Sequence, residues 1–458
     1  MTHFIEKLAT SAWNRFKERR TARTENGGTT TLGFRVADEE RTRQSVTLSH
    51  TRRTTHLALL GKTGTGKSSL LRHLCQEDIK AGRGFVFFDL HGDATPFLLR
   101  AIAREEWAQQ THLSDRLLVI SPADPEMSVG MNPLEDAEPD FVRVAEFAEV
   151  LKQRWGLEHF GARTDELLRN TLYALSVNGM TLLELSPFLT HAEFRTQCLK
   201  RLQNVEVRHY FENRYGAASE PMKATMREPI LNKTSAFTAD PRFRHIVGQA
   251  RSTFSLRESM DRGDWVIAHL EKGRLGEHAL TLASLFFTVI KNALFARKSK
   301  SLFTVYCDEI QNLIAYSQDV ETVLSEARKF GVGIVTANQF LDQYPAATRA
   351  AILSVGTHVF FQLSGADAAA VAQILDGGKS LAERLKNLPQ RHFILKSGAE
   401  HWVEGVAPTV TDATTSYTDL LNRSRVRHAR PRAEVEREIA GRHAAFTTTT
   451  KDALHDWD

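Results

Sequence analysis

The chain has 458 residues, of which 42% are hydrophobic and 25% are charged, as expected for a folded protein with one large or two medium domains. Its formal net charge of +4 excludes a strong overall cationic field, so charge alone does not indicate nucleic-acid binding. The three cysteines, Cys75, Cys198 and Cys307, are odd in number and far apart, which excludes a disulfide framework and favours a reducing cytosol.

The first predicted element is an N-terminal amphipathic helix. Apolar side chains share one face of it: Phe4, Ile5, Leu8, Ala12 and Phe16. Residues 1–20 therefore suit peripheral contact with the inner membrane or docking onto a partner, although packing against the protein's own body is the interpretation that we favour. A polar linker follows at residues 24–31, so we expect residues 1–53 to form a helix and linker. No segment reaches the roughly 18 to 20 apolar residues that span a bilayer, and we expect a cytoplasmic protein without a transmembrane segment.

From residue 56 onward, short apolar runs alternate with amphipathic stretches, which is typical of α/β units around a parallel sheet. Strands are predicted at residues 56–60, 84–90, 117–120, 266–270, 302–307, 333–337, 358–363 and 392–395. Residues 139–249 show helical periodicity instead, so we expect an all-helical domain inserted into one α/β domain made of residues 54–138 and 250–410. Residues 411–458 are expected to be a solvated tail, in which Arg423 to Arg442 interleave Arg with Glu, with phosphate contact as the alternative.

A glycine-rich turn follows the strand predicted at residues 56–60 and precedes an apolar-periodic helix. The candidate nucleotide-binding residues are Gly61, Lys62, Thr63, Gly64, Thr65, Gly66, Lys67, Ser68 and Ser69. Glycine lets backbone N–H groups converge on a phosphate chain, and the following helix adds its dipole. Lys67 is predicted to bind the β and γ phosphates and Ser68 to bind Mg²⁺. The strand before the turn and the helix after it favour an ATP and Mg²⁺ site over a simple glycine-rich turn.

Two adjacent carboxylates end the strand predicted at residues 302–307. We expect Asp308 to hold Mg²⁺ and Glu309 to act as general base on the attacking water. An N-cap is the alternative role for Asp308, but the complete phosphate loop makes it the weaker interpretation. Gln339 follows the next strand, where it is predicted to bind the γ-phosphate or the attacking water, with ordinary loop polarity as the competing interpretation.

Three other groups of polar residues have open alternatives. Arg328 ends a helix, where it either offsets the helix dipole or reaches the γ-phosphate of a neighbouring subunit in trans. The acidic and histidine side chains after residue 88 suit a metal or a water, but turn formation is favoured; they are Asp89, His91 and Asp93. A basic cluster suits a nucleic-acid backbone or a solvated helix end; it consists of Lys291, Arg297, Lys298 and Lys300.

Several motifs occur in a fixed order along the chain: GKTGTGKSSLL, FFDLHGD, MNPLE, FSLRESMDRGDWVIAHLEKGRLGE, CDEIQNL and LSEARKFGVGIVTANQF. This ordered set resembles the cytosolic ATPases of conjugative type IV secretion coupling proteins, within the HerA–FtsK group, over about residues 54–408. The resemblance implies a RecA-like P-loop domain bearing an all-α domain, a homo-hexamer, and ATP-driven DNA translocation with secretion or relaxosome proteins as partners. It supports the roles given above to Lys67, Ser68, Asp308, Glu309 and Gln339, and it favours the trans role of Arg328.

Three alternative functions stay open at this point. Membrane-anchored coupling proteins have N-terminal transmembrane helices and this sequence shows none, so one alternative is a soluble HerA-like DNA translocase outside conjugation. The second is a nucleotide-dependent switch or assembly factor that moves nothing. The third is a pump for protein substrates that the helical insertion would recognise. The adjacent Asp308 and Glu309 favour hydrolysis, because a switch needs only the metal-binding acid.

Overall fold

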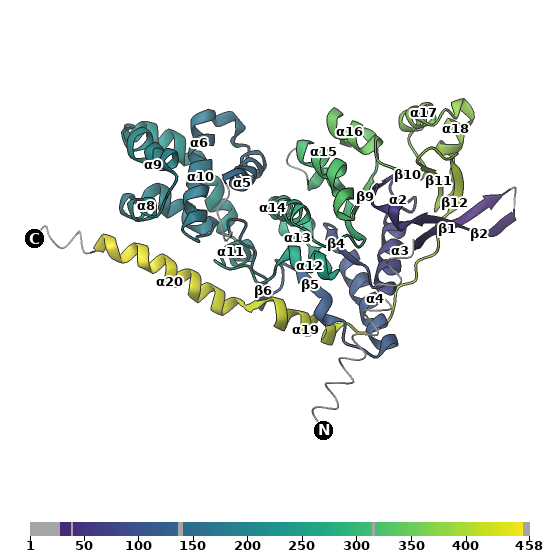
Figure 1. Cartoon of the computed structure of the whole chain (residues 1–458), viewed down its shortest axis with the longest axis horizontal. Helices are drawn as coiled ribbons and strands as arrows, with labels where there is room; N and C mark the ends of the chain where they lie inside the picture. Colours follow the sequence, from purple (N-terminus) through teal and green to yellow (C-terminus); the bar gives the residue numbers. More distant parts are fainter. Residues whose placement is uncertain (1–27, 38–39, 136–140, 314–316, 452–458) are drawn as a thin grey trace, which may run out of the picture.

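The computed structural model describes residues 28–37, 40–135, 141–313 and 317–451. A strand-containing domain and a helical domain lie side by side, and a long C-terminal helix runs along the lower edge of the helical one (Figure 1). The predicted N-terminal helix lies outside the described residues.

Seven neighbouring parallel strands form one part of an eleven-stranded sheet and reach one of its edges. In spatial order they are β10 (Thr357–Phe360), β3 (Leu57–Leu60), β9 (Val332–Asn338), β8 (Phe303–Asp308), β4 (Gly84–Asp89), β7 (Trp265–His269) and β5 (Leu117–Ile120). Strands β3, β4 and β9 are buried along their whole length, as expected for parallel strands covered on both faces. All seven were predicted from their apolar runs, with small differences at the ends.

Helices cover the two faces of this parallel region. On one face, α3 (Lys67–Lys80) and α4 (Ala94–Gln109) pack on alternate strand residues such as Phe85 and Phe87. On the other, α12 (Leu256–Arg262), α14 (His278–Phe295) and α15 (Ser317–Glu326) pack on the intervening residues such as Val86 and Phe88. Helices α16 (Ala346–Leu353), α17 (Gly365–Ile374) and α18 (Gly378–Lys386) lie near β10, and α13 (Lys272–Leu275) precedes α14. The period-two alternation of each strand thus supplies both halves of the core.

Four antiparallel strands extend the sheet beyond β10. They are β11 (His392–Ser397), β12 (Val403–Val406), β1 (Thr29–Ala37) and β2 (Glu40–Ser49). The expectation of a helix and linker through residue 53 is therefore wrong for residues 29–37 and 40–49. Val46 and Leu48 are buried and Thr47 between them is exposed, which is strand periodicity in a segment too polar to attract attention.

The helical domain contains no strand among its described residues 141–249. Its helices are α5 (Phe141–Arg154), α6 (Ala162–Val177), α7 (Leu185–Thr190), α8 (Ala192–Leu199), α9 (Val205–His209), α10 (Glu220–Thr238) and α11 (Pro241–Val247). Leu168, Leu172 and Leu175 on α6 are buried, as the helical periodicity predicts. One continuous apolar core joins this domain to the sheet through α14.

Helix α14 is long and apolar enough by composition to cross a membrane, but 78% of its residues are buried inside the protein. It packs against α5 and α12 on one face of the sheet. Burial on this scale identifies it as a core helix.

The C-terminal segment is folded, so the expectation of a solvated tail is wrong for its described part. Helix α19 (Thr418–His428) packs on α4 and β5, β13 (Arg430–Pro431) pairs with β6 (Met127–Ser128), and α20 (Arg432–Lys451) packs on α11. Arg423 and Arg425 form ion pairs with Glu106 and Asp124 of the sheet domain. Arg442 reaches the buried carboxylate of Glu184 in the helical domain at 3.1 Å.

A buried ionic network ties the amino end of the sheet together. The Asp78 carboxylate accepts hydrogen bonds from Arg53 at 2.6 and 2.7 Å, from Arg83 at 2.6 Å and from the Tyr306 hydroxyl at 2.6 Å. Burial raises the pKa of Asp78, but the two guanidinium groups outweigh it and hold that pKa below its ordinary value. The carboxylate is therefore ionised and fully paired in the folded state.

The variant Asp78→Asn is expected to lower the free energy of unfolding by about 3–5 kcal/mol, because it leaves two buried cations without their counter-charge. Tyr306→Phe, which removes one hydrogen bond, is expected to cost about 1 kcal/mol. The folded pKa of Asp78 is depressed, so its contribution is present at neutral pH and declines only below the unfolded value of about 3.9. Urea unfolding at pH 7 measures both variants, and equal stability of Asp78→Asn and wild type would contradict the assignment.

Candidate active site

The glycine-rich turn at residues 61–66 joins the end of β3 to the start of α3. Gly64 and Gly66 have φ angles of 78° and 124°, which residues with a β-carbon rarely adopt. A β-carbon on Gly61 would lie 2.6 Å from the Cβ of Phe361. Glycine is thus favoured at both positions that the phosphate-loop pattern specifies, Gly61 and Gly66, and also at Gly64 between them.

Lys67 and Ser68 occupy the mouth of this turn. The buried Lys67 ammonium donates to the carbonyls of Gly61 at 2.5 Å and Lys62 at 2.9 Å, and Thr65 Oγ1 donates to the Lys62 carbonyl at 2.7 Å. Burial lowers the pKa of Lys67, and the nearby carboxylates oppose that shift. Gly61, Lys62 and Thr65 therefore hold the turn and place the cation where a phosphate chain would bind.

The two predicted metal ligands lie together. Ser68 Oγ donates to Asp308 Oδ2 at 3.2 Å, although the two residues are 240 positions apart. Burial raises the pKa of Asp308, against the effects of His91 and Ser68. A hydroxyl beside a carboxylate is an oxygen donor set of the kind that Mg²⁺ prefers. These two oxygens fit a cation whose remaining ligands come from phosphate and water. The described residues contain no cluster of three or more His, Cys, Asp or Glu side chains that would hold a metal.

Glu309 and Gln339 are joined to the phosphate loop by a hydrogen-bonded chain. Thr63 Oγ1 donates to Gln339 Oε1 at 3.0 Å, and Gln339 Nε2 donates to Glu309 Oε1 at 3.0 Å. Strand β9 lies between β3 and β8, so the side chain that follows β9 bridges the loop and the acid. Glu309 itself has a φ of 57°, and its backbone N–H donates to the Ala337 carbonyl at 2.8 Å.

A cavity of about 410 Å³ lies over these groups. Its lining includes Thr63, Gly64, Gly66, Lys67, Ser68, Ser69, His91, Asp308, Glu309, Asn338, Gln339, Gln390 and Arg391. His91 Nε2 lies 3.9 Å from Glu309 Oε2. Asp89 instead accepts from the Gly92 and Thr95 backbone N–H groups, so the turn interpretation holds for this acid and only the histidine of the FFDLHGD motif reaches Glu309.

The sequence did not indicate Gln390 and Arg391, which lie in the loop before β11. Gln390 Nε2 donates to the Gly64 carbonyl at 3.1 Å, and the Arg391 backbone N–H donates to the Thr65 carbonyl at 2.8 Å. Arg391 has a φ of 68°. These contacts close the side of the phosphate loop that faces away from β9. Nothing in the spacing of the sequence connects this loop with a turn more than 300 residues earlier.

Arg328 does not reach the cavity of its own chain. It is exposed and precedes β9, whereas the cavity lies at the carboxyl end of that strand. The seven residues of β9 span roughly 20 Å. Among the described residues, the Arg328 side chain has no hydrogen bond or ion pair, and it borders a groove of about 860 Å³ with Arg52 and His56. A role in trans stays a prediction.

The predicted basic cluster is only half exposed. Lys291 is buried and pairs with Glu146 at 2.8 Å. Arg297 is buried and donates to the backbone carbonyls of Phe330 and Ser301. These two cations hold helix α14 in place and do not offer a face to a phosphate backbone, so the nucleic-acid interpretation is wrong for them. Lys298 and Lys300 are exposed.

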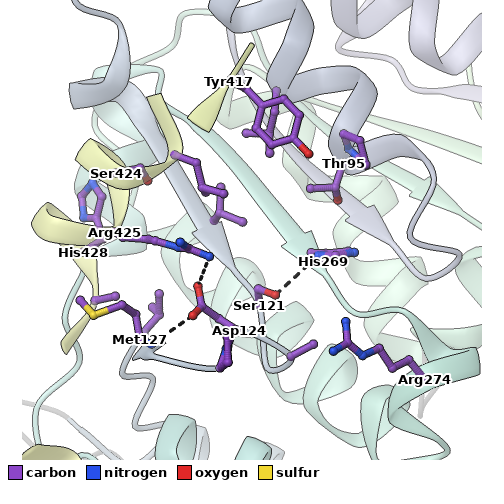
Figure 2. A pocket seen from close by; sticks show the side chains of 18 residues that line it. Thr95, Ser121, Asp124, Met127, His269, Arg274, Tyr417, Ser424, Arg425 and His428 are labelled. Atoms are coloured by element: carbon purple, nitrogen blue, oxygen red, sulfur yellow. Dashed lines mark hydrogen bonds and ion pairs between the residues drawn. The ribbon is translucent and has the colours of Figure 1, made fainter. Parts of the chain in front are cut away.

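A second cavity, of about 280 Å³, lies under α19 at the carboxyl ends of β5 and β7. Figure 2 shows Ser121, His269 and Arg274 on one side of it and the α19 residues on the other, with Arg425 directed at Asp124. None of the predicted site residues lines it. It is therefore separate from the nucleotide cavity.

Residues 34–241 match the family described as Helicase HerA, central domain, and no curated protein sequence matches the chain. The bacterial conjugative coupling protein TrwBdeltaN70 superposes with a TM-score of 0.62 and 18% identity, over 84% of this chain and 95% of that one. TrwB with ADP and Mg²⁺ gives a TM-score of 0.59 and 17% identity, covering 85% and 97%.

VirB4 of Thermoanaerobacter pseudethanolicus gives a TM-score of 0.55 and 12% identity, covering 84% and 97%. At these identities the structural likeness shows the fold, which is a RecA-like P-loop fold with an inserted all-α domain. The family match over residues 34–241 and this shared fold confirm the resemblance to the coupling protein ATPases of the HerA–FtsK superfamily.

Proposed function

We propose that the chain is a Mg-ATP hydrolase that acts as a homo-hexameric DNA translocase of the coupling protein type. The main support for the hydrolase activity is the chain of hydrogen bonds from Thr63 through Gln339 to Glu309. It joins the phosphate loop to the general base across β9. Structures of TrwB with ADP and Mg²⁺ and with a non-hydrolysable ATP analogue support the same ligands for this cavity.

Each residue has a defined task in hydrolysis. The loop N–H groups and Lys67 bind the phosphates, and Ser68 and Asp308 hold Mg²⁺, which supplies positive charge to the phosphate oxygens. Glu309 accepts the proton of the attacking water, because its carboxylate lies at the end of the cavity beside Asp308. Gln339 orients that water, since its amide already contacts both the loop and the base.

The proposals of a homo-hexamer and of DNA as the substrate are supported by different observations. Arg328 is an exposed cation at the end of the sheet opposite the cavity, so a neighbouring subunit is needed for it to approach a γ-phosphate. DNA as the substrate comes from the ordered motifs and from the printed descriptions of TrwB as a conjugative coupling protein and of the matched family as a helicase domain. That family match equally supports a DNA translocase outside conjugation.

Glu309→Gln is expected to keep ATP affinity and to lower kcat by about 10²–10⁴-fold, because only the proton acceptor is lost. Lys67→Ala is expected to weaken ATP binding about tenfold to hundredfold, since a charge-assisted contact to phosphate is removed. Calorimetry and phosphate release measure the two effects. Glu77→Gln, at the far end of α3, is the matched control. Full turnover by Glu309→Gln would contradict its role as base.

Arg328→Ala is expected to bind ATP normally and to lose about three to five orders of magnitude in turnover. Mixing it with the Lys67→Ala variant restores part of the activity, because a mixed ring contains interfaces with both residues intact. Lys329→Ala removes the adjacent cation, which pairs with Glu326 of its own chain, and is expected to have wild-type turnover. An active Arg328→Ala variant would refute the trans contact.

DNA is expected to stimulate the ATPase rate several-fold, and electron microscopy with nucleotide is expected to show six-fold rings. Monomers whose turnover ignores DNA would instead indicate the nucleotide-dependent switch. Competition of DNA against candidate protein partners in the same assay distinguishes the protein pump, whose stimulation by the partner would survive excess DNA.

A further inference from the structure

The last residue of α5 links the helical domain to the turn that follows the catalytic acid. The Arg154 guanidinium donates from Nε to Ser284 Oγ on α14 at 2.7 Å and from Nη2 to the Asn312 carbonyl at 2.6 Å. Ser284 Oγ in turn donates to the Leu313 carbonyl at 2.8 Å. One arginine and one serine therefore hold two successive carbonyl groups of the segment after Glu309.

This segment is a short 3-10 turn, Ile310–Asn312, and it reaches back to the catalytic carboxylate. Asn312 Nδ2 donates to Glu309 Oε2 at 2.9 Å, and the Asn312 backbone N–H donates to the Glu309 carbonyl at 2.9 Å. Gln339 occupies the other carboxylate oxygen. Both oxygens of Glu309 are thus positioned by amides, one from the residue that follows β9 and one from a turn that Arg154 anchors.

Arg154 has no ion-pair partner, among the residues that the structure describes, that would explain its place. No described carboxylate lies within ion-pair distance of its guanidinium, and burial lowers the pKa of Arg154, with only a partial opposing effect from Glu277. Placing a partly buried cation against neutral acceptors costs free energy that an apolar residue would not. The contacts that it makes are with backbone and hydroxyl oxygens of the Glu309 turn and of α14.

We propose that Arg154 is a positioning residue for ATP hydrolysis: it fixes the turn at residues 310–313 and thereby sets the Glu309 carboxylate for its water. This inference rests on the proposed hydrolase function. Glu309 has a left-handed backbone conformation, which persists only where the surroundings hold it. The helical domain thereby contributes to the chemistry of a site that none of its described residues lines.

Arg154→Ala is expected to lower kcat about tenfold to hundredfold, because a displacement of roughly 1 Å of a catalytic group has an effect of this size. The Kd for ATP is expected to stay unchanged, since no phosphate-binding group is touched. Arg154→Lys keeps one donor and is expected to restore part of kcat. The control is Lys152→Ala on the same helix, whose ammonium pairs with Glu149 and Asp165 inside the helical domain; it is expected to match wild type.

A double variant tests the route from Arg154 to the acid. Asn312→Ala removes the amide that holds Glu309 but keeps the backbone carbonyl that Arg154 binds. If Arg154 acts through this amide, the combined variant is no slower than Asn312→Ala alone.

Fold-changes in kcat that multiply in the double variant would overturn the inference. So would wild-type kcat in Arg154→Ala, or an equal loss of ATP affinity and kcat, which indicates general structural damage. A wild-type chain that binds ATP without turnover would overturn the proposed hydrolase and this role together, whereas an active wild type with an equally active Arg154→Ala overturns this role alone.

Discussion

The nucleotide site depends on the order of three strands. Because β9 lies between β3 and β8 and all three are parallel, their carboxyl ends deliver the phosphate loop, Gln339 and the two acids to one edge of the sheet. The middle strand sets the spacing: the side chain that follows it spans the gap between Thr63 and Glu309 with one amide. An order in which β9 did not lie between β3 and β8 would separate the same residues. The polar groups of the site are thus positioned by the apolar packing of buried strands.

The sheet domain and the helical domain share one apolar core. This core begins on β4 and β7 and continues through α14 into the helical domain. Buried or partly buried cations also connect elements of the two domains. Lys291 joins α14 to Glu146 of α5, and Arg154 joins α5 to the segment after β8. A cation with long reach and several donors suits such junctions, where both apolar stem and polar head must be accommodated.

Local patterns allowed the sequence to predict the phosphate loop, the acid pair and all seven parallel strands, since each is encoded within about ten consecutive residues. Contacts between segments that are distant in the sequence could not be predicted from such local patterns. Gln390 and Arg391 meet the loop only because β11 returns beside β10. Lys291 and Arg297 were expected at the surface because of their charges. The partners that allow their burial, one of them Glu146, lie on other elements and cannot be identified from the local sequence. Strand β2 was missed because a single buried pair, Val46 and Leu48, marks its inner face.

The C-terminal segment has a mechanical consequence. Helix α19 is fastened to the sheet domain by Arg423 and Arg425, and α20 to the helical domain by Arg442. Between them, Arg430 and Pro431 form a two-residue strand with β6, and the proline ring restricts its own φ. The segment therefore links the two domains by a short connection. While the ion pairs of α19 and α20 stay formed, the domains can move apart only as far as the chain between these helices allows, and a relative rotation of the domains has to bend the chain near Arg430 and Pro431.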